Sequence, residues 1–214
     1  MGRRIVVLLV GLTILAFGIA MSKKANIGTT PISCIPATLT DCFGLTIGTW
    51  TILFNILLVG IEVALLGRNF HPVQVLQIAL AFFLGLMTDA SMEVLTWLNA
   101  DSYLEQWFFC VLACVILAFG VMMEIRAKLL VVPGDGLVMA LATKVTKYPF
   151  HRLKIFVDAT MAITACVISL LAVGHLTGAR EGTIFAALAV GTFIGFYRAR
   201  FGGYIDRLLG DSEE

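Results

Sequence analysis

The sequence predicts an all-α integral membrane protein with six transmembrane helices and two re-entrant half-helices, arranged as a 3+3 inverted-topology repeat. Apolar residues make up 59% of the 214 positions and charged residues 14%, more apolar surface than one soluble core of this length can hide. Six apolar runs approach the about 20 residues that a spanning helix needs. The octapeptide ILAFGIAM, residues 14–21, returns as ILAFGVMM at residues 116–123.

The six runs follow one another along the whole chain. They cover residues 5–21, 46–66, 73–96, 106–125, 155–174 and 183–198. The first run, preceded by Arg3 and Arg4, resembles a cleaved signal peptide, but its second copy in mid-chain favours a retained helix.

Three runs fall in each half of the chain, so the second copy must enter the membrane from the opposite side. Two apolar helices can resemble one another by chance, but the equal halves and a matching interruption in each favour a true repeat. We therefore divide the chain into two units. The first, 1–100, has a half-helix near 30–40; the second, 101–214, has a half-helix near 135–146 and a short cytoplasmic tail.

The basic residues predict the orientation in the membrane. With the N-terminus inside, all Lys and Arg residues fall on the cytoplasmic side except Lys23, Lys24 and Arg180. Both termini are then cytoplasmic. The net charge of +1, with no basic stripe, excludes nucleic-acid binding.

The interruption in each half is the most informative feature for function. The segments are KKANIGTTPISCIPATLTDCFGLTIG after the first run and RAKLLVVPGDGLVMALATKVTKYPFHR after the fourth. Each breaks at a Gly/Pro cluster and resumes an apolar run of about ten residues, too short to span but long enough for a half-helix. Thr30 before Pro31, and Asp135 before Gly136, are predicted N-caps. Surface-lying amphipathic segments without a substrate role are the alternative.

A substrate site is expected where the two half-helices meet, because irregular backbone at membrane depth is tolerated only when buried or lining a wet cavity. Helix N-termini favour carboxylate, sulfonate or phosphate groups. The Thr29–Thr30 half suits an anion and the Asp135 half an amine, so a zwitterion matches both. The predicted substrate-binding residues are Gly28, Thr29, Thr30, Pro31, Asn55, Pro133, Gly134, Asp135, Gly136 and Asp158.

Acidic residues within the runs are candidates for function, since charge inside a membrane is costly. Asp158 is expected either to take up a proton or contact a cation, or to pair with Lys154 one turn earlier. For Glu62, with Arg68 nearby at the interface, and for Glu124, we favour a structural role.

Two segments of the second half carry a family resemblance. VPGDGLVMAL at 132–141 and EGTIFAALAVGTFIGFY at 181–197 resemble the bacterial YczE/YyaS/YitT group of membrane proteins, in which a PxDxL-like turn and a later GT-containing segment recur. IGTTPIS at 27–33 is similar to the corresponding turn but lacks its acidic residue. The resemblance implies a multi-pass protein of the bacterial inner (cytoplasmic) membrane, in a group described as of unknown function or linked to transport, and supplies no substrate.

These features predict a transporter of a small organic anion or zwitterion that works by alternating access, with proton or cation coupling. The alternatives are an ion or solute channel and a non-transporting membrane scaffold or sensor subunit. We expect no enzyme, catalytic residue, metal or cofactor, because HExxH, GxSxG and P-loop patterns are missing from the sequence. The expected partners are a small-molecule substrate, membrane lipid and, as an option that nothing in the residues requires, a second copy in a homodimer.

Overall fold

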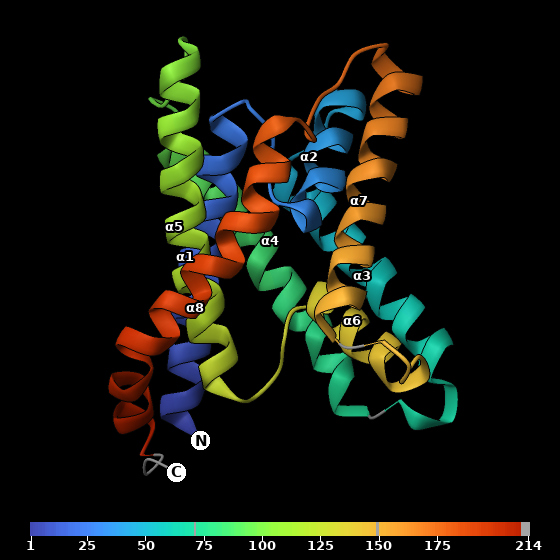
Figure 1. Ribbon diagram of the computed structural model, residues 1–214, viewed down its shortest axis with the longest axis vertical. Helices are drawn as coiled ribbons and strands as arrows, with labels where there is room; N and C mark the ends of the chain where they lie inside the picture. Colours follow the sequence, from blue (N-terminus) through green and yellow to red (C-terminus); the bar gives the residue numbers. More distant parts are fainter. Residues whose placement is uncertain (71, 149, 211–214) are drawn as a thin grey trace.

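Long and short α-helices make up the described chain, residues 1–70, 72–148 and 150–210 of a computed structural model (Figure 1). The long helices are α1 (Gly2–Lys24), α3 (Ile47–Leu66), α4 (Leu76–Val94), α5 (Tyr103–Ala127), α7 (Phe150–Val173) and α8 (Glu181–Leu209). The short helices are α2 (Pro31–Phe43) and α6 (Pro133–Lys144), and two 3-10 turns, η1 (Gly67–Asn69) and η2 (Pro72–Val75), lie between α3 and α4. These ranges contain no strand.

Six helices in the described ranges are long and apolar enough to cross a bilayer, which confirms the six predicted spans and a multi-pass membrane architecture. The last helix is longer than predicted. Helix α8 continues to Leu209, 29 residues in all, and an ion pair between Arg126 of α5 and Asp206 holds its far end. Most of the expected cytoplasmic tail is therefore helix, and residues 211–214 lie outside the described ranges.

The two octapeptides pack against each other where α1 crosses α5. A Cβ atom on Gly18 would lie 2.6 Å from Leu117 Cγ, and one on Gly120 would lie 2.6 Å from the backbone nitrogen of Leu15. Leu15 and Leu117 are the second residues of their octapeptides, and the two glycines are the fifth. Each octapeptide therefore presents the same leucine and glycine to the other, and the glycines permit the close approach of the two backbones.

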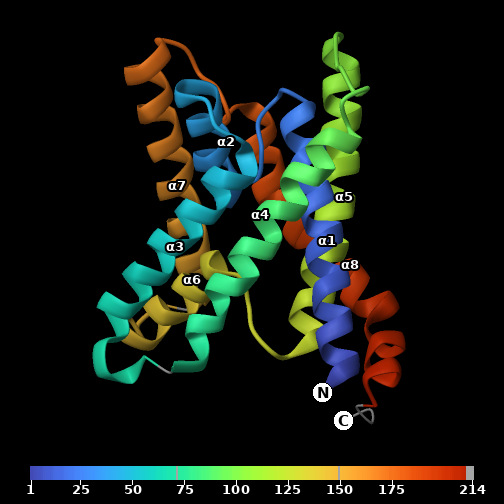
Figure 2. The same cartoon turned by 180° about the vertical axis from the view of Figure 1, so that it is seen from behind.

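Helices α2 and α6 occupy the two Gly/Pro-interrupted segments and run toward opposite ends of the molecule. They have 13 and 12 residues, about 20 and 18 Å at 1.5 Å per residue, too short for a bilayer core of about 30 Å. Figures 1 and 2 show that each begins near mid-height, α2 returning to the end where α1 finishes and α6 to the end where α5 finishes. Their N-terminal turns touch: a Cβ atom on Gly134 would lie 2.5 Å from Ile32 Cδ1.

Helices α3 and α4 form a closed seam, defined by Gly48 on α3 and Gly85 and Asp89 on α4. A Cβ on Gly48 would lie 2.1 Å from the carbonyl oxygen of Gly85, so the helices meet backbone to backbone. The Asp89 carboxylate accepts the Gly48 N–H at 2.7 Å and the Thr46 hydroxyl at 2.6 Å. Among the described residues, α7 and α8 make no comparable contact.

Candidate functional site

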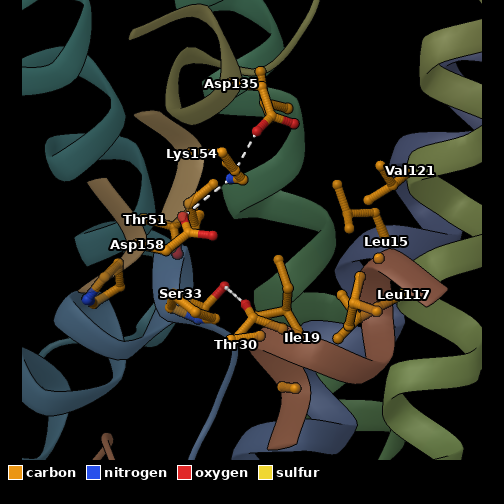
Figure 3. A pocket seen from close by; sticks show the side chains of 18 of the residues that line it. Leu15, Ile19, Thr30, Ser33, Thr51, Leu117, Val121, Asp135, Lys154 and Asp158 are labelled. Atoms are coloured by element: carbon orange, nitrogen blue, oxygen red, sulfur yellow. Dashed lines mark hydrogen bonds and ion pairs between the residues drawn. The ribbon is translucent and has the colours of Figure 1, made fainter. Parts of the chain in front are cut away.

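A cavity of about 230 Å³ lies at the centre of the bundle, and every described α-helix contributes to its lining. Its polar side chains are Thr30, Ser33, Thr51, Asn55, Asp135, Lys154 and Asp158. Its apolar lining includes Leu15, Ile19, Phe54, Leu84, Leu117 and Val121. Figure 3 shows the labelled charged groups on one side and Leu15, Leu117 and Val121 across from them. The volume is below the about 300–1,000 Å³ typical of drug-sized ligands, so the cavity suits a small molecule.

Three charged side chains form the polar end of the cavity. Lys154 on α7 donates to Asp135 Oδ1 in the first turn of α6 at 2.8 Å, and its Nζ lies 3.1 Å from Asp158 Oδ1 one turn along α7 (Figure 3). The predicted pairing of Asp158 with Lys154 is therefore present, and Asp135 shares the same ammonium group. Two acids face one base, so the cluster has one more acidic than basic side chain.

Hydroxyl groups lie at the N-terminus of α2. Thr30 is the N-cap residue of α2, as predicted, but its side chain makes no capping hydrogen bond to the helix backbone. Its hydroxyl donates instead to the Ser33 hydroxyl at 3.1 Å, and both residues line the cavity. The positive end of the α2 dipole thus lies at the cavity beside two hydroxyl groups.

The predicted N-cap role of Asp135 is wrong. Helix α6 begins at Pro133 with Val132 as N-cap, so Asp135 lies inside the first turn. Proline is favoured at the first helical position because its φ is already helical and its missing N–H has no partner to lose. The carboxylate of Asp135 is consequently free of capping and turns toward Lys154.

The structure brings half of the predicted site residues to the cavity: Thr30, Pro31, Asn55, Asp135 and Asp158 line it. Pro133, Gly134 and Gly136 lie in the first turn of α6 and do not line the cavity. Gly28 and Thr29 line a separate polar pocket.

This second pocket has a volume of about 310 Å³ and lies between the C-terminal end of α1 and the α7–α8 linker. Its charged residues include Lys23, Asp41 and Arg180, with Lys23 Nζ 2.5 Å from Asp41 Oδ2. Thr29 donates its N–H to the carbonyl of Gly178 at 2.9 Å. The segment before α2 is thereby fastened to the α7–α8 linker and separates the two pockets.

Lys154, Thr51 and Ser33 were not predicted as site residues. A sequence signal existed for two of them, because Thr51 precedes Asn55 by the same four positions that separate Lys154 from Asp158. That spacing puts each pair on one helix face. The polar face of each helix therefore turns toward the cavity.

Glu62 differs from its interpretation as an interfacial residue near Arg68. Its side chain is 0% exposed and packs at the junction of α3, α4 and α6. Neither carboxylate oxygen has a hydrogen-bond partner among the described residues. An isolated sequence gives no sign of this burial, because it depends on which face of α3 meets α6.

Glu124 keeps the structural role expected for it and holds the start of α6. The side chain is 1% exposed, and its Oε1 accepts the Val132 N–H at 2.6 Å. We expect Glu124→Ala to lower the free energy of unfolding by about 2 to 3 kcal/mol, because it leaves a buried N–H without a partner and opens a void. Glu124→Gln keeps an acceptor oxygen and should cost less than half as much. Denaturant titrations in detergent measure both, and equal losses would contradict the assignment.

Comparison with known proteins now places the chain in a family. Residues 2–199 match a family model described as "Family of unknown function (DUF6198)". The chain is also 27% identical over 131 residues to "Uncharacterized protein YyaS" of Bacillus subtilis, covering 61% of this chain and 64% of that protein. No solved structure matches. The chain thus belongs to the DUF6198 family and is a YyaS-like helical membrane protein.

Proposed function

We propose that this protein is a small-solute transporter that works by alternating access in a bacterial cytoplasmic membrane, with both termini in the cytoplasm. The observation that carries the proposal is the central cavity, lined from every described α-helix, with a charged cluster on one side and an apolar wall on the other. Cavities of this kind at the meeting point of two short helices are typical of transporters with repeated halves.

We infer that α1–α4 and α5–α8 form an inverted repeat, which would support this mechanism. The reciprocal contacts of Gly18 with Leu117 and of Gly120 with Leu15 are those expected beside a two-fold axis in the membrane plane. The short helix of each half also packs on the corresponding long helix of the other half: α2 packs on α7, and α6 packs on α3. Under this proposal α2 and α6 are re-entrant half-helices that enter from opposite faces of the membrane.

A difference in packing between the halves supports two alternating states. The α3–α4 seam is closed at Gly48 and Gly85, whereas among the described residues α7 and α8 make no comparable contact. The Thr29–Gly178 hydrogen bond joins the α1–α2 and α7–α8 linkers. Both linkers lie in the half of the molecule away from the termini (Figure 1). The described state then faces the side of the termini, and exchanging the two arrangements would open the α3–α4 seam toward the other side.

The cavity chemistry favours a zwitterion or an amine over a simple anion. The excess acid in the Asp135–Lys154–Asp158 cluster attracts an ammonium group, and the N-terminus of α2 with the Thr30 and Ser33 hydroxyls suits a carboxylate. An apolar body would lie along Leu15 and Leu117. A small amino-acid-like solute satisfies all three surfaces.

The test combines ligand binding with uptake. Melting temperature is measured in detergent with amino acids, amines, carboxylates, sulfonates and phosphates at equal concentration; a ligand at one hundred times its Kd adds about 2.7 kcal/mol. We expect a selective shift from an amine-bearing solute that Asp158→Asn abolishes and Asp41→Asn, in the second pocket, preserves. The labelled solute should then enter proteoliposomes with saturation. Currents without saturation would favour a channel, and folded protein with neither a shift nor uptake would favour a scaffold or sensor.

A further inference from the structure

A buried polar pair, Glu62 and Gln77, lies outside both pockets, where α3, α4 and α6 meet. Glu62 is 0% exposed and Gln77 of α4 is 2% exposed. A Cβ on Gly136 of α6 would lie 2.6 Å from Glu62 Oε1 and 3.0 Å from Gln77 Nε2, so both side chains pack against the same glycine. Both Glu62 oxygens and Gln77 Oε1 lack hydrogen-bond partners in the described part of the chain.

We propose that Glu62 is a proton-binding site that couples proton movement to solute transport, and that Gln77 lies between this site and the cavity in the other state. The coupling rests on the transporter function proposed above. A fully buried carboxylate without a cation is strongly disfavoured in a membrane, whereas a neutral carboxylic acid is tolerated beside a neutral amide such as that of Gln77. A proton is the ligand that removes this charge without needing space in a packed junction. Glu62 holds it while the junction is closed.

The groups around Glu62 leave no competing counter-charge. On α4 the facing group is the neutral amide of Gln77, and on α6 it is the backbone of Gly136. Asp135, one residue earlier on α6, is paired with Lys154, and Glu124 of α5 accepts from Val132. Arg68, further along the chain from Glu62, is exposed. Among the described residues, therefore, nothing cationic is joined to Glu62 by an ion pair.

The repeat indicates how the proton reaches water. Gln77 lies six residues before Phe83 of the motif FLGL, and Ala187 lies six residues before Phe193 of the matching FIGF. Ala187 lines the open cavity in the described state. If the two halves interchange their conformations, Gln77 takes the place of Ala187 at the cavity. The α3–α4 seam is then open, and Glu62 gains access to the opposite side of the membrane.

The junction is also mechanically linked to the solute cavity. Gly136 touches Glu62, and Asp135, the preceding residue, binds Lys154 in the charged cluster. A carboxylate formed at Glu62 would be drawn to the positive N-terminal end of α6. Loss of the proton therefore acts on the turn that carries Asp135, and solute binding at Asp135 acts back on the proton site.

Infrared spectroscopy of the protein in lipid nanodiscs tests the proton site without any solute. We expect the wild type to show a protonated-carboxyl signal at neutral pH that Glu62→Gln reduces and that Asp41→Asn, at an acid paired with Lys23, leaves unchanged. Gln77→Leu should shift that signal, because the neighbouring amide is gone, and it keeps the test open should Glu62→Gln fold poorly. An identical carboxyl region in wild type, Glu62→Gln and Gln77→Leu would overturn the proposal.

Proteoliposomes test the coupling, using the solute identified by the thermal panel. A pH gradient should drive accumulation by the wild type, whereas Glu62→Gln should exchange labelled for unlabelled solute yet lose accumulation. Accumulation by Glu62→Gln equal to wild type would overturn the coupling. Absence of any wild-type uptake would instead refute the transporter function, and with it the coupling, while the infrared result still decides whether Glu62 binds a proton.

Discussion

Gly48→Leu is expected to be among the most destabilising single substitutions in this chain, lowering the free energy of unfolding by about 3 kcal/mol or more. Its Cβ would lie 2.1 Å from the Gly85 carbonyl and 2.5 Å from the Asp89 carboxylate. Backbone atoms cannot rotate away, so α3 and α4 must separate. That separation also breaks the bonds of Asp89 to Gly48 and Thr46.

Gly60→Leu is the matched control, on the same helix. A Cβ on Gly60 meets nothing within 4 Å, so the change should be neutral or should stabilise α3 by up to about 1 kcal/mol through helix propensity. Denaturant titrations of both variants in the same detergent give the comparison. Equal losses for the two variants would show that the seam is not tightly packed and would remove the asymmetry on which the two-state proposal depends.

Lys154→Met is expected to abolish binding of the solute found by the thermal panel, because Asp135 and Asp158 lose the ammonium group that holds both carboxylates in place, and to lower stability by about 2 kcal/mol. The substitution leaves Asp135 and Asp158 facing one another without their shared cation. The side chains are partly exposed to the cavity, so the cost falls between those of exposed and fully buried ion pairs. Melting temperature with and without solute measures both effects.

Two further variants separate charge from packing. Adding Asp158→Asn to Lys154→Met removes one of the unpaired acids and should recover part of the stability but not the binding. Lys23→Met removes a similar ion pair, with Asp41, in the second pocket and should leave solute binding intact. Solute binding retained in Lys154→Met would contradict the assignment of the cluster to the solute site.

The sequence predicted the larger part of the fold, because the signals were local. A span requires only enough consecutive apolar residues, and the six long helices match the predicted runs. The break at Pro31 and the resumption to Phe43 were equally readable, since proline and glycine determine where a helix starts. Asp158 was identified as a site candidate because polar residues within apolar segments are rare, and Asn55 as its counterpart in the other half. Thr30 and Asp135 were identified because they lie at the Gly/Pro interruptions.

The errors arose where several elements meet. The start of α6 was placed at Asp135 rather than Pro133, because two capping rules competed within three residues. Glu62 was placed at the membrane interface because Arg68 is close along the chain, while its side chain lies against Gly136 and Gln77. Helical periodicity states which residues share a face but not which neighbour covers that face.

Composition and local pattern alone determined that this chain is a six-span helical membrane protein with two interrupted segments. Tertiary structure alone decided which polar groups share a cavity, that Lys154 joins Asp135 to Asp158, and that the α3–α4 seam is closed while α7 and α8 stand apart. The reason is physical: burial in the membrane depends on short-range properties of each segment, whereas a site depends on contacts between residues far apart in the chain.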